Sequence, residues 1–324
     1  MIWVRAEQQD ISNDVKNQIE SIVKNGSVIT FGNFDGLHLG HRNLLQDVTL
    51  SATAMNVPAV VFTFKPHPRT VLNPELPFHR MFDHTDQFEI LNQLGVNILF
   101  EEKFTKILAE IGAREFFIKY VVELFRAKHV VVGYDFSFGR KREGNLEFLQ
   151  KICTEYGIQL TIKKPYSIEG QIVSSSTIRR FLQHGEVHRA QIFLGRKYYL
   201  RGIIQKAFQR GRQIGVPTAN IHPDICFLPR QGVYFTLSHL QGQTYKSITN
   251  IGFNPTFQSR NPDDIGQLKV ETHVFDFNQD VYGEKLTVEL VHFCRDEIKF
   301  SSIDHLKEQI NKDIQQARDY FATH

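Results

Sequence analysis

The chain has 324 residues, of which 41% are apolar and 23% are charged, a composition typical of a globular protein with a buried core. The formal net charge of +3 is too small for the strongly basic surface that binds a nucleic-acid backbone, so we expect no nucleic-acid partner. No run of about 18 apolar residues predicts a membrane span, and residues 1–10 lack the apolar stretch of a secretion signal. We therefore expect a cytoplasmic protein without a membrane partner, either a monomer or a weak homo-oligomer.

The three cysteines are Cys153, Cys226 and Cys294, and they lie far apart in the sequence. An odd number at this spacing fits neither a disulfide framework nor a zinc site with paired ligands. We expect all three to be reduced and buried.

The first half of the chain alternates short β-branched runs with segments of helical periodicity, a pattern typical of a parallel sheet wrapped by helices. Helices are expected around residues 88–94 and 116–124, where apolar residues recur at steps of three and four. We assign this α/β domain to residues 1–186. The predicted strands are residues 28–31, 59–62, 97–100, 129–132 and 159–162.

After residue 186, glycine and proline separate short strand-like runs such as 232–236 and 286–291, with no helix between them. This pattern predicts a small β-barrel in a second domain, residues 187–324. Ser301 and Asp304 have the spacing of a capping box, and apolar residues then recur at helical steps. A terminal helix is expected to pack on the barrel.

The sequence Gly-Asn-Phe-Asp-Gly-Leu-His-Leu-Gly-His follows the first predicted strand directly, and a helical period begins after it. Such a strand-to-helix turn presents backbone N–H groups and the positive end of a helix dipole to a phosphate. His38 and His41 can donate to the same triphosphate and stabilise the charge that develops as pyrophosphate leaves. The alternative is that Asp35 caps the helix and both histidines are surface residues. Besides the two catalytic histidines, the predicted nucleotide-binding residues are Gly32, Asn33, Phe34, Asp35, Gly36 and Gly40.

This turn resembles the HxGH signature of the nucleotidyltransferase superfamily, and three further stretches follow where a doubly wound sheet places its ligand. Residues 62–68 end a strand in a rigid extended loop, residues 132–139 end another strand, and the serine-rich residues 174–179 open a helix. Each has a structural alternative, because prolines stop strands, aromatic residues fill cores and serines cap helices.

Together these stretches resemble the FMN adenylyltransferase module of the prokaryotic bifunctional riboflavin kinase/FAD synthetase family, over about residues 20–185. The resemblance implies a Rossmann-like nucleotidyltransferase domain in which the FMN phosphate attacks the α-phosphorus of magnesium-bound ATP without a general base. It implies that Asp135 contacts nucleotide or flavin and that Ser174, Ser175, Ser176 and Arg179 bind the ATP phosphates. The implied flavin-binding residues are Phe64, Pro66, His67 and Pro68.

A second candidate site lies in the barrel half, where residues 211–220 read Gly-Arg-Gln-Ile-Gly-Val-Pro-Thr-Ala-Asn. Thr218 and Asn220 are two residues apart and point to one side of an extended chain, where both oxygens could bind one Mg²⁺. The alternative is a simple Gly-Pro turn before a strand. Downstream, Glu271 lies in an alternating strand, either as a paired surface residue or as a poised base.

The order of these motifs, with Asn-Ile-Gly at residues 250–252 and Arg-Asp-Glu-x-x-Phe at 295–300, resembles the riboflavin kinase module over about residues 187–322. The resemblance implies that Glu271 takes the proton of the ribityl 5′-hydroxyl. It also implies an Mg-ATP site at Gly211, Gly215, Pro217, Thr218 and Asn220, and a flavin site at Asn250, Arg295, Glu297 and Phe300. Ala207 stands where the family usually has glycine, and a positive φ there would cost about 1 kcal/mol.

The favoured function is therefore bifunctional: riboflavin and ATP give FMN in the barrel, and FMN and ATP give FAD in the α/β domain. One alternative is that only one activity is retained and the other module is structural or flavin-binding. Another is a relative of tRNA synthetases, which would need a Lys-Met-Ser-Lys-Ser-like loop and a basic face. The sequence shows neither.

Overall fold

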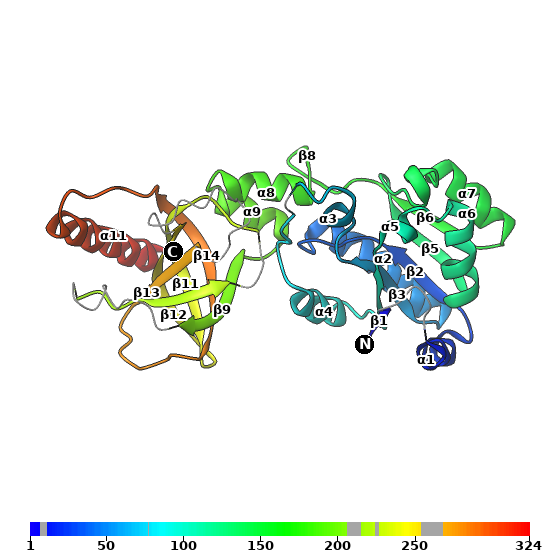
Figure 1. Cartoon of the computed structure of the whole chain (residues 1–324), viewed down its shortest axis with the longest axis horizontal. Helices are drawn as coiled ribbons and strands as arrows, with labels where there is room; N and C mark the ends of the chain where they lie inside the picture. The colour runs from blue at the N-terminus through cyan, green and yellow to red at the C-terminus, as the bar shows by residue number, and fades with distance from the viewer. Residues whose placement is uncertain (7–11, 77, 206–214, 224–226, 254–267) are drawn as a thin grey trace. The chain divides into compact units, whose positions relative to one another are not determined.

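The computed structural model describes residues 1–6, 12–76, 78–205, 215–223, 227–253 and 268–324 (Figure 1). The chain forms two compact units. The first contains Met1–Phe78 and His84–Ser174, and the second contains His79–Asp83 and Ser175–His324. Residue 186, where the sequence places the domain boundary, lies inside the second unit.

The first unit is built on a six-stranded, entirely parallel sheet with the order β1-β4-β3-β2-β5-β6. All five predicted strands are present in this sheet, and the sequence missed its edge strand β1. The strands are β1 (Ile2–Ala6), β2 (Ser27–Phe31), β3 (Ala59–Lys65), β4 (Ile98–Lys103), β5 (Ala127–Gly133) and β6 (Gln159–Lys163).

Helices cover this sheet, with a two-stranded hairpin of β7 (Ser167–Ile168) and β8 (Gln171–Ile172) near the end of the unit (Figure 1). The helix expected at residues 116–124 is a short α6 (Ala113–Phe116) that continues as the π-helix η1 (Phe117–Leu124). The other helices are α1 (Asn13–Val23), α2 (Leu39–Met55), α3 (Pro68–Leu72), α4 (His84–Gln93), α5 (Lys106–Ala109), the 3₁₀ helix η2 (Arg140–Arg142) and α7 (Leu146–Glu155).

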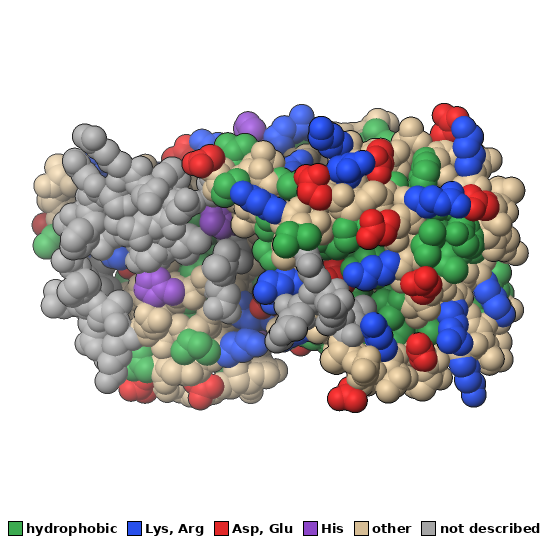
Figure 2. All heavy atoms as spheres, turned by 45° about the vertical axis from the view of Figure 1, so that its right-hand side comes forward, with side chains coloured by type: hydrophobic (Ala, Val, Ile, Leu, Met, Phe, Trp, Pro, Cys, Tyr) green, Lys and Arg blue, Asp and Glu red, His purple; other side chains and the backbone are tan. Residues whose placement is uncertain are grey.

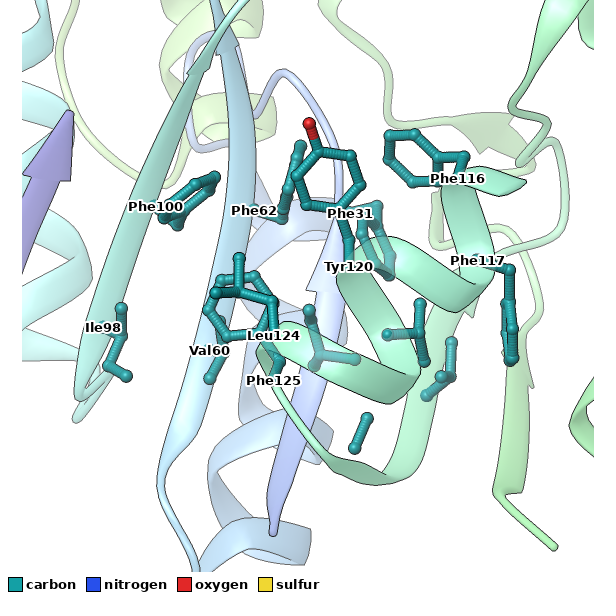
Figure 3. Close-up of a cluster of buried hydrophobic side chains, with 14 of the residues drawn as sticks. Phe31, Val60, Phe62, Ile98, Phe100, Phe116, Phe117, Tyr120, Leu124 and Phe125 are labelled. Atoms are coloured by element: carbon teal, nitrogen blue, oxygen red, sulfur yellow. The ribbon is translucent and has the colours of Figure 1, made fainter. Parts of the chain in front are cut away.

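One face of the sheet is buried under η1 by an aromatic cluster (Figure 3). Phe31, Phe62 and Phe100 come from neighbouring strands, and the rings of Phe62 and Tyr120 lie 5.0 Å apart in an edge-to-face arrangement. Each fully buried ring of this kind stabilises the fold by about 1.5–3 kcal/mol. The cluster therefore fixes the strands whose carboxyl ends carry the first candidate site.

The second unit begins with two helices, α8 (Ser175–Gln183) and α9 (Val187–Leu194), which lead into the predicted barrel. The barrel is closed and antiparallel, with the order β10-β13-β12-β11-β14-β9. Its strands are β9 (Tyr199–Gln205), β10 (Ala219–Pro223), β11 (Gly232–Leu240), β12 (Gln243–Phe253), β13 (Leu268–Val274) and β14 (Lys285–Arg295).

The terminal helix α11 (Ile303–Thr323) packs against the outside of the barrel, as the sequence predicts. Ala317 of this helix is fully buried against Val233, Phe235 and Ile248. The cap differs from the expected one, because Ser302 accepts the N–H of His305 at 3.2 Å and the helix starts one residue after Ser302.

The barrel interior holds a chain of buried hydroxyl groups that the sequence did not predict. Adjacent members of the chain are linked by hydrogen bonds of 2.8 to 2.9 Å. Strand side chains alternate between the two faces, so Glu271, next to Thr272, is on the outer face. The five hydroxyl residues are Thr236, Ser238, Ser247, Thr249 and Thr272.

The segment His79–Asp83 belongs to the second unit although it lies in the first half of the sequence. Met81 is fully buried, and the ring of Phe82 lies 4.8 Å from that of Tyr199. The N–H of Phe227 donates to the carbonyl of Arg80 at 2.7 Å. These contacts make a short early segment part of the second unit's core.

The cysteines follow the prediction only in part. Cys153 is buried, Cys294 is only partly buried, and neither forms a disulfide. Cys226 lies outside the described residues. Among the helices that the structure describes, none is long and apolar enough to cross a membrane.

Candidate active sites

The turn after β2 places the two histidines of the first motif together. His38 is the N-cap of α2, and its Nδ1 atom accepts the backbone N–H of His41 at 3.2 Å. The two rings stack with centroids 3.6 Å apart. His38 is 5% exposed and Asp35 is buried, so the alternative of an Asp35 cap with surface histidines is wrong.

The backbone of this turn is strained in a way that its packing offsets. Phe34 and Leu37 adopt φ of 47° and 38°, a left-handed conformation that costs non-glycine residues about 1–3 kcal/mol. Both side chains are buried against Leu45 and Val61. The core therefore holds the turn in a conformation that its own residues do not favour.

Gly32, Gly36 and Gly40 serve this turn for three separate reasons. A Cβ atom on Gly32 would lie 3.1 Å from the ring of Phe34, and Gly36 has a φ of 83°. A Cβ atom on Gly40 would lie 3.2 Å from both His38 Nδ1 and the carbonyl oxygen of Val173. The last contact places Val173, and with it the start of the serine cluster at Ser174, beside the amino end of α2.

The extended stretch that the sequence predicts after β3 is short, because a helix begins at Pro68. Pro68 starts the short helix α3, and His67 caps it by accepting the N–H of Arg69 at 3.1 Å. Proline fits the first position of a helix because that N–H has no partner in the helix. The ring of His67 stacks on Phe78 at 3.9 Å, whereas Phe64 packs into the aromatic core beside Phe104.

The stretch after β5 divides its residues between the core and the surface. Phe136 lies 5.9 Å from Phe31, and Phe138 lies 5.7 Å from Phe116, so the aromatic residues fill the core. Asp135 is exposed. Because β3 and β5 flank β2, the ends of all three strands meet at one sheet edge, which brings Asp135, Pro66 and the histidine turn to the same edge.

The serine cluster is divided between the two units. Ser174 is the last residue of the first unit, and Ser175 and Ser176 open α8 in the second. Arg179 donates to the carbonyl of His79 at 2.8 Å, and its guanidinium lies 4.9 Å from the ring centre of Phe227. A phosphate-binding role for these residues stays a prediction.

The second candidate site is a row of polar side chains across three neighbouring strands on the outer face of the barrel. Glu271 on β13 pairs directly with Asn220 on β10 and with Asn250 on β12. Direct cross-strand partners have Cβ atoms about 4.5–5.5 Å apart. The Glu271 side chain is 34% exposed and lies 3.8 Å from Lys269 Nζ, so it is paired and still accessible.

The segment before Asn220 is held against the same row. The carbonyl of Pro217 lies 2.8 Å from His273 Nδ1, and Asn220 Nδ2 donates to the carbonyl of Thr218 at 3.5 Å. Gly215 has a φ of 82° with open space around it, so its backbone conformation requires glycine there. Gly211 and Ala207 lie outside the described residues.

The residues after β14 have structural partners that the sequence did not reveal. Arg295 pairs with the buried carboxylate of Asp313 on α11, with nitrogen–oxygen distances of 2.6 to 3.1 Å. Glu297 accepts from Asn250 Nδ2 at 3.5 Å and fills the space where Gly252 lacks a side chain. Phe300 is partly buried. Arg295 therefore anchors the terminal helix, and flavin contacts for these residues stay a prediction.

A parallel sheet with a histidine-capped strand-to-helix turn is followed by a closed barrel that carries the row Asn220–Glu271–Asn250, and together they define a class of two-module proteins. Residues 20–177 match the FAD synthetase family, and residues 194–321 match the riboflavin kinase family. Within the described ranges, no cluster of three or more histidine, cysteine, aspartate or glutamate side chains is arranged to hold a metal ion.

Relatives match nearly the whole chain. A bifunctional riboflavin kinase/FMN adenylyltransferase of Bacillus subtilis is 34% identical over 91% of this chain and 93% of the relative. One from Haemophilus influenzae is 34% identical over 92% and 96%. The chain belongs to the bifunctional riboflavin kinase/FMN adenylyltransferase family. A crystal structure described as a macrolide-efflux protein from Streptococcus pneumoniae is 30% identical, with a TM-score of 0.83 over 98% of this chain and 99% of that one.

Proposed function

We propose that the chain makes both flavin cofactors: its barrel unit phosphorylates riboflavin to FMN, and its sheet unit adenylylates FMN to FAD. The observation that supports this most directly is that one chain carries the His38 turn on a parallel sheet and the Asn220–Glu271–Asn250 row on a barrel. The first module matches the FAD synthetase family, and the second matches the riboflavin kinase family.

In the sheet unit, the chemistry requires position and charge. The FMN phosphate is anionic at neutral pH, so it can attack the α-phosphorus of ATP without a base. The amino end of α2 and the histidine side chains would stabilise the leaving pyrophosphate. Because His38 Nδ1 accepts a hydrogen bond, the proton of its neutral ring is on Nε2, and we infer that this N–H donates to the ATP phosphates.

In the barrel unit the nucleophile is a neutral alcohol, and a base is useful. Glu271 is an accessible carboxylate that can accept the ribityl proton as the bond to the γ-phosphorus forms. The oxygens of Thr218 and Asn220 are the hard donors that Mg²⁺ prefers, so these residues would hold it together with the nucleotide. Bound there, the ion would neutralise charge on the transferred phosphoryl group.

The partners of both sites are the small molecules ATP, riboflavin, FMN and FAD, and we place the enzyme in the cytoplasm, where ATP is supplied. On the face in Figure 2, Lys and Arg side chains are interspersed with Asp and Glu over the described surface. This mixed charge supports the expectation that nucleic acid is not a partner. A monomer or weak homo-oligomer stays the expectation for the assembly.

One experiment tests both activities and the alternative that only one is retained. The pure protein is incubated with riboflavin, ATP and Mg²⁺, and the flavins are separated by chromatography over time. We expect FMN to appear first and FAD to follow. Accumulation of FMN without FAD would contradict the adenylyltransferase assignment. Absence of FMN, with FAD formed only from added FMN, would contradict the kinase assignment.

A further inference from the structure

A buried carboxylate at the carboxyl end of β4 belongs to neither candidate site described above. Glu101 is 3% exposed, and its Oε2 atom lies 2.7 Å from His84 Nδ1. Its Oε1 atom lies 3.8 Å from Arg5 Nε and 3.9 Å from Lys65 Nζ. The three basic side chains come from α4, β1 and β3, so one carboxylate joins three elements of the first unit.

The partners of Glu101 determine its charge. Burial opposes ionisation, but the hydrogen bond and charge of His84, with the charges of Lys65 and Arg5, outweigh it and hold the pKa of Glu101 below its usual value. The next residue shows the opposite balance, because burial raises the pKa of Glu102 to about 7. Glu101 is therefore an anion that its basic neighbours stabilise.

One of these neighbours leads into the predicted flavin site. Lys65 is the last residue of β3 and directly precedes Pro66, His67 and Pro68. Its backbone carbonyl accepts the N–H of Phe104, which follows β4, at 3.0 Å. The end of β4 thus holds Lys65 by its backbone through Phe104 and by its side chain through Glu101.

The other two basic side chains hold the rest of the cluster in place. His84 is the first residue of α4. The Arg5 guanidinium lies 3.9 Å from the ring centre of Trp3, and that ring stacks on Phe88 of α4 at 5.2 Å. The cluster is therefore linked to α4 twice, through His84 and through the Trp3 ring that stacks on Phe88. Lys65 is the member that leads into residues 66–68.

We propose that Glu101 is a positioning residue for FMN adenylylation, which holds Lys65 and thereby the loop Pro66–Pro68 in the orientation that binds FMN. The inference rests on the proposed function of the first unit. A purely structural ion cluster would stabilise the fold without acting on one substrate more than on the other. The two roles therefore differ in the expected change of KM for FMN relative to ATP.

The test uses Glu101→Gln in the full-length chain, with steady-state FAD synthesis from added FMN. We expect KM for FMN to rise about fivefold, as for the loss of a charge pair with half-exposed partners, while KM for ATP, kcat and riboflavin phosphorylation stay unchanged. The matched control is Glu147→Gln, which removes an exposed carboxylate paired with Lys151 in the same unit and should change none of these values.

Substitutions of Lys65 test the same Lys65–Glu101 ion pair from its solvent-exposed side. They keep the proposal testable if Glu101→Gln does not fold. Lys65→Met should raise KM for FMN, Lys65→Arg should restore it, and Lys65→Met combined with Glu101→Gln should do no more than either alone. Unchanged KM for FMN in Lys65→Met, or equal shifts for both substrates, would overturn the inference. Absence of FAD synthesis in the wild type would instead overturn the proposed function.

Discussion

His38 Nδ1 accepts the backbone N–H of His41 at 3.2 Å, and this hydrogen bond determines the tautomer of the neutral His38 ring. An accepting ring nitrogen carries no hydrogen, so the neutral ring is protonated on Nε2. His38 therefore caps α2 and, in the proposed function, also donates to the ATP phosphates. The two roles can be separated by substitution.

Replacing His38 tests the donor role. We expect His38→Ala to lower kcat for FAD synthesis by about 100-fold or more, because it removes a donor to developing charge, and to destabilise the first unit by about 1 kcal/mol through loss of the cap. His38→Asn is the matched control, since asparagine caps helices well but lacks the Nε2 donor. It should recover the stability and leave FAD synthesis slow. Normal FAD synthesis in His38→Asn would show that capping alone is required.

Replacing Glu271 tests the base in the barrel. Glu271→Gln keeps the size of the side chain and removes its basicity, so riboflavin phosphorylation should fall by about 10²–10⁴-fold while FAD synthesis from added FMN is unchanged. Glu284→Gln, at an exposed turn of the same unit, is the control. A kinase rate within about threefold of the wild type would rule out a base role for Glu271.

Glu102 gives the first unit a distinct pH dependence of stability. Burial raises the pKa of this carboxyl from 4.5 to about 7, against the smaller opposing effects of the neighbouring Tyr120 and Lys119 side chains. The folded state then binds the proton more tightly than the unfolded state, so the free energy of unfolding falls as pH rises from 4.5 to about 7.

Glu102→Gln should remove this loss. At about pH 8 the variant is expected to be more stable than the wild type by roughly 3 kcal/mol, and the difference should vanish near pH 4. Urea unfolding at several pH values measures it. Parallel pH profiles for the two proteins would show that folding does not change the pKa of Glu102.

The buried pair of Arg295 and Asp313 predicts that single and double substitutions change the stability of the second unit differently. Asp313→Leu or Arg295→Met alone leaves one charge buried without its partner and should destabilise the second unit by about 3–5 kcal/mol. The double variant should regain most of this stability. If Arg295 acts only through α11, the double variant should also phosphorylate riboflavin normally. Loss of activity in a stable double variant would support the predicted flavin contact.

Local sequence predicted the central strands because buried parallel strands are continuous apolar runs. It missed β1, a five-residue edge strand in which Arg5 is exposed. It also could not separate a π-helix from an α-helix at residues 117–124, because both bury apolar residues at similar steps. The sequence predicted Ser301 as the cap of α11, but Ser302 is the cap. Local sequence does not distinguish two adjacent serines as helix caps.

The sequence predicted the motifs of both candidate sites, but it did not predict how their residues are arranged in space. His38 was not foreseen as a cap because histidine is not among the preferred N-cap residues. The alignment of Asn220, Glu271 and Asn250 depends on strand register, which no local pattern specifies. The partner of Arg295 lies 18 positions away on another element, so only the folded chain reveals it.

The short segment His79–Asp83 makes the second unit discontinuous in sequence. The polypeptide passes between the units at residues 78–79, 83–84 and 174–175. A single cut at residues 174–175 therefore leaves His79–Asp83, which belongs to the second unit, attached to the first. A fragment that starts at Ser175 lacks the Phe82 ring that covers Tyr198 and Tyr199. The two modules are therefore not interchangeable cassettes, and an exchange between relatives would have to carry this early segment with the barrel.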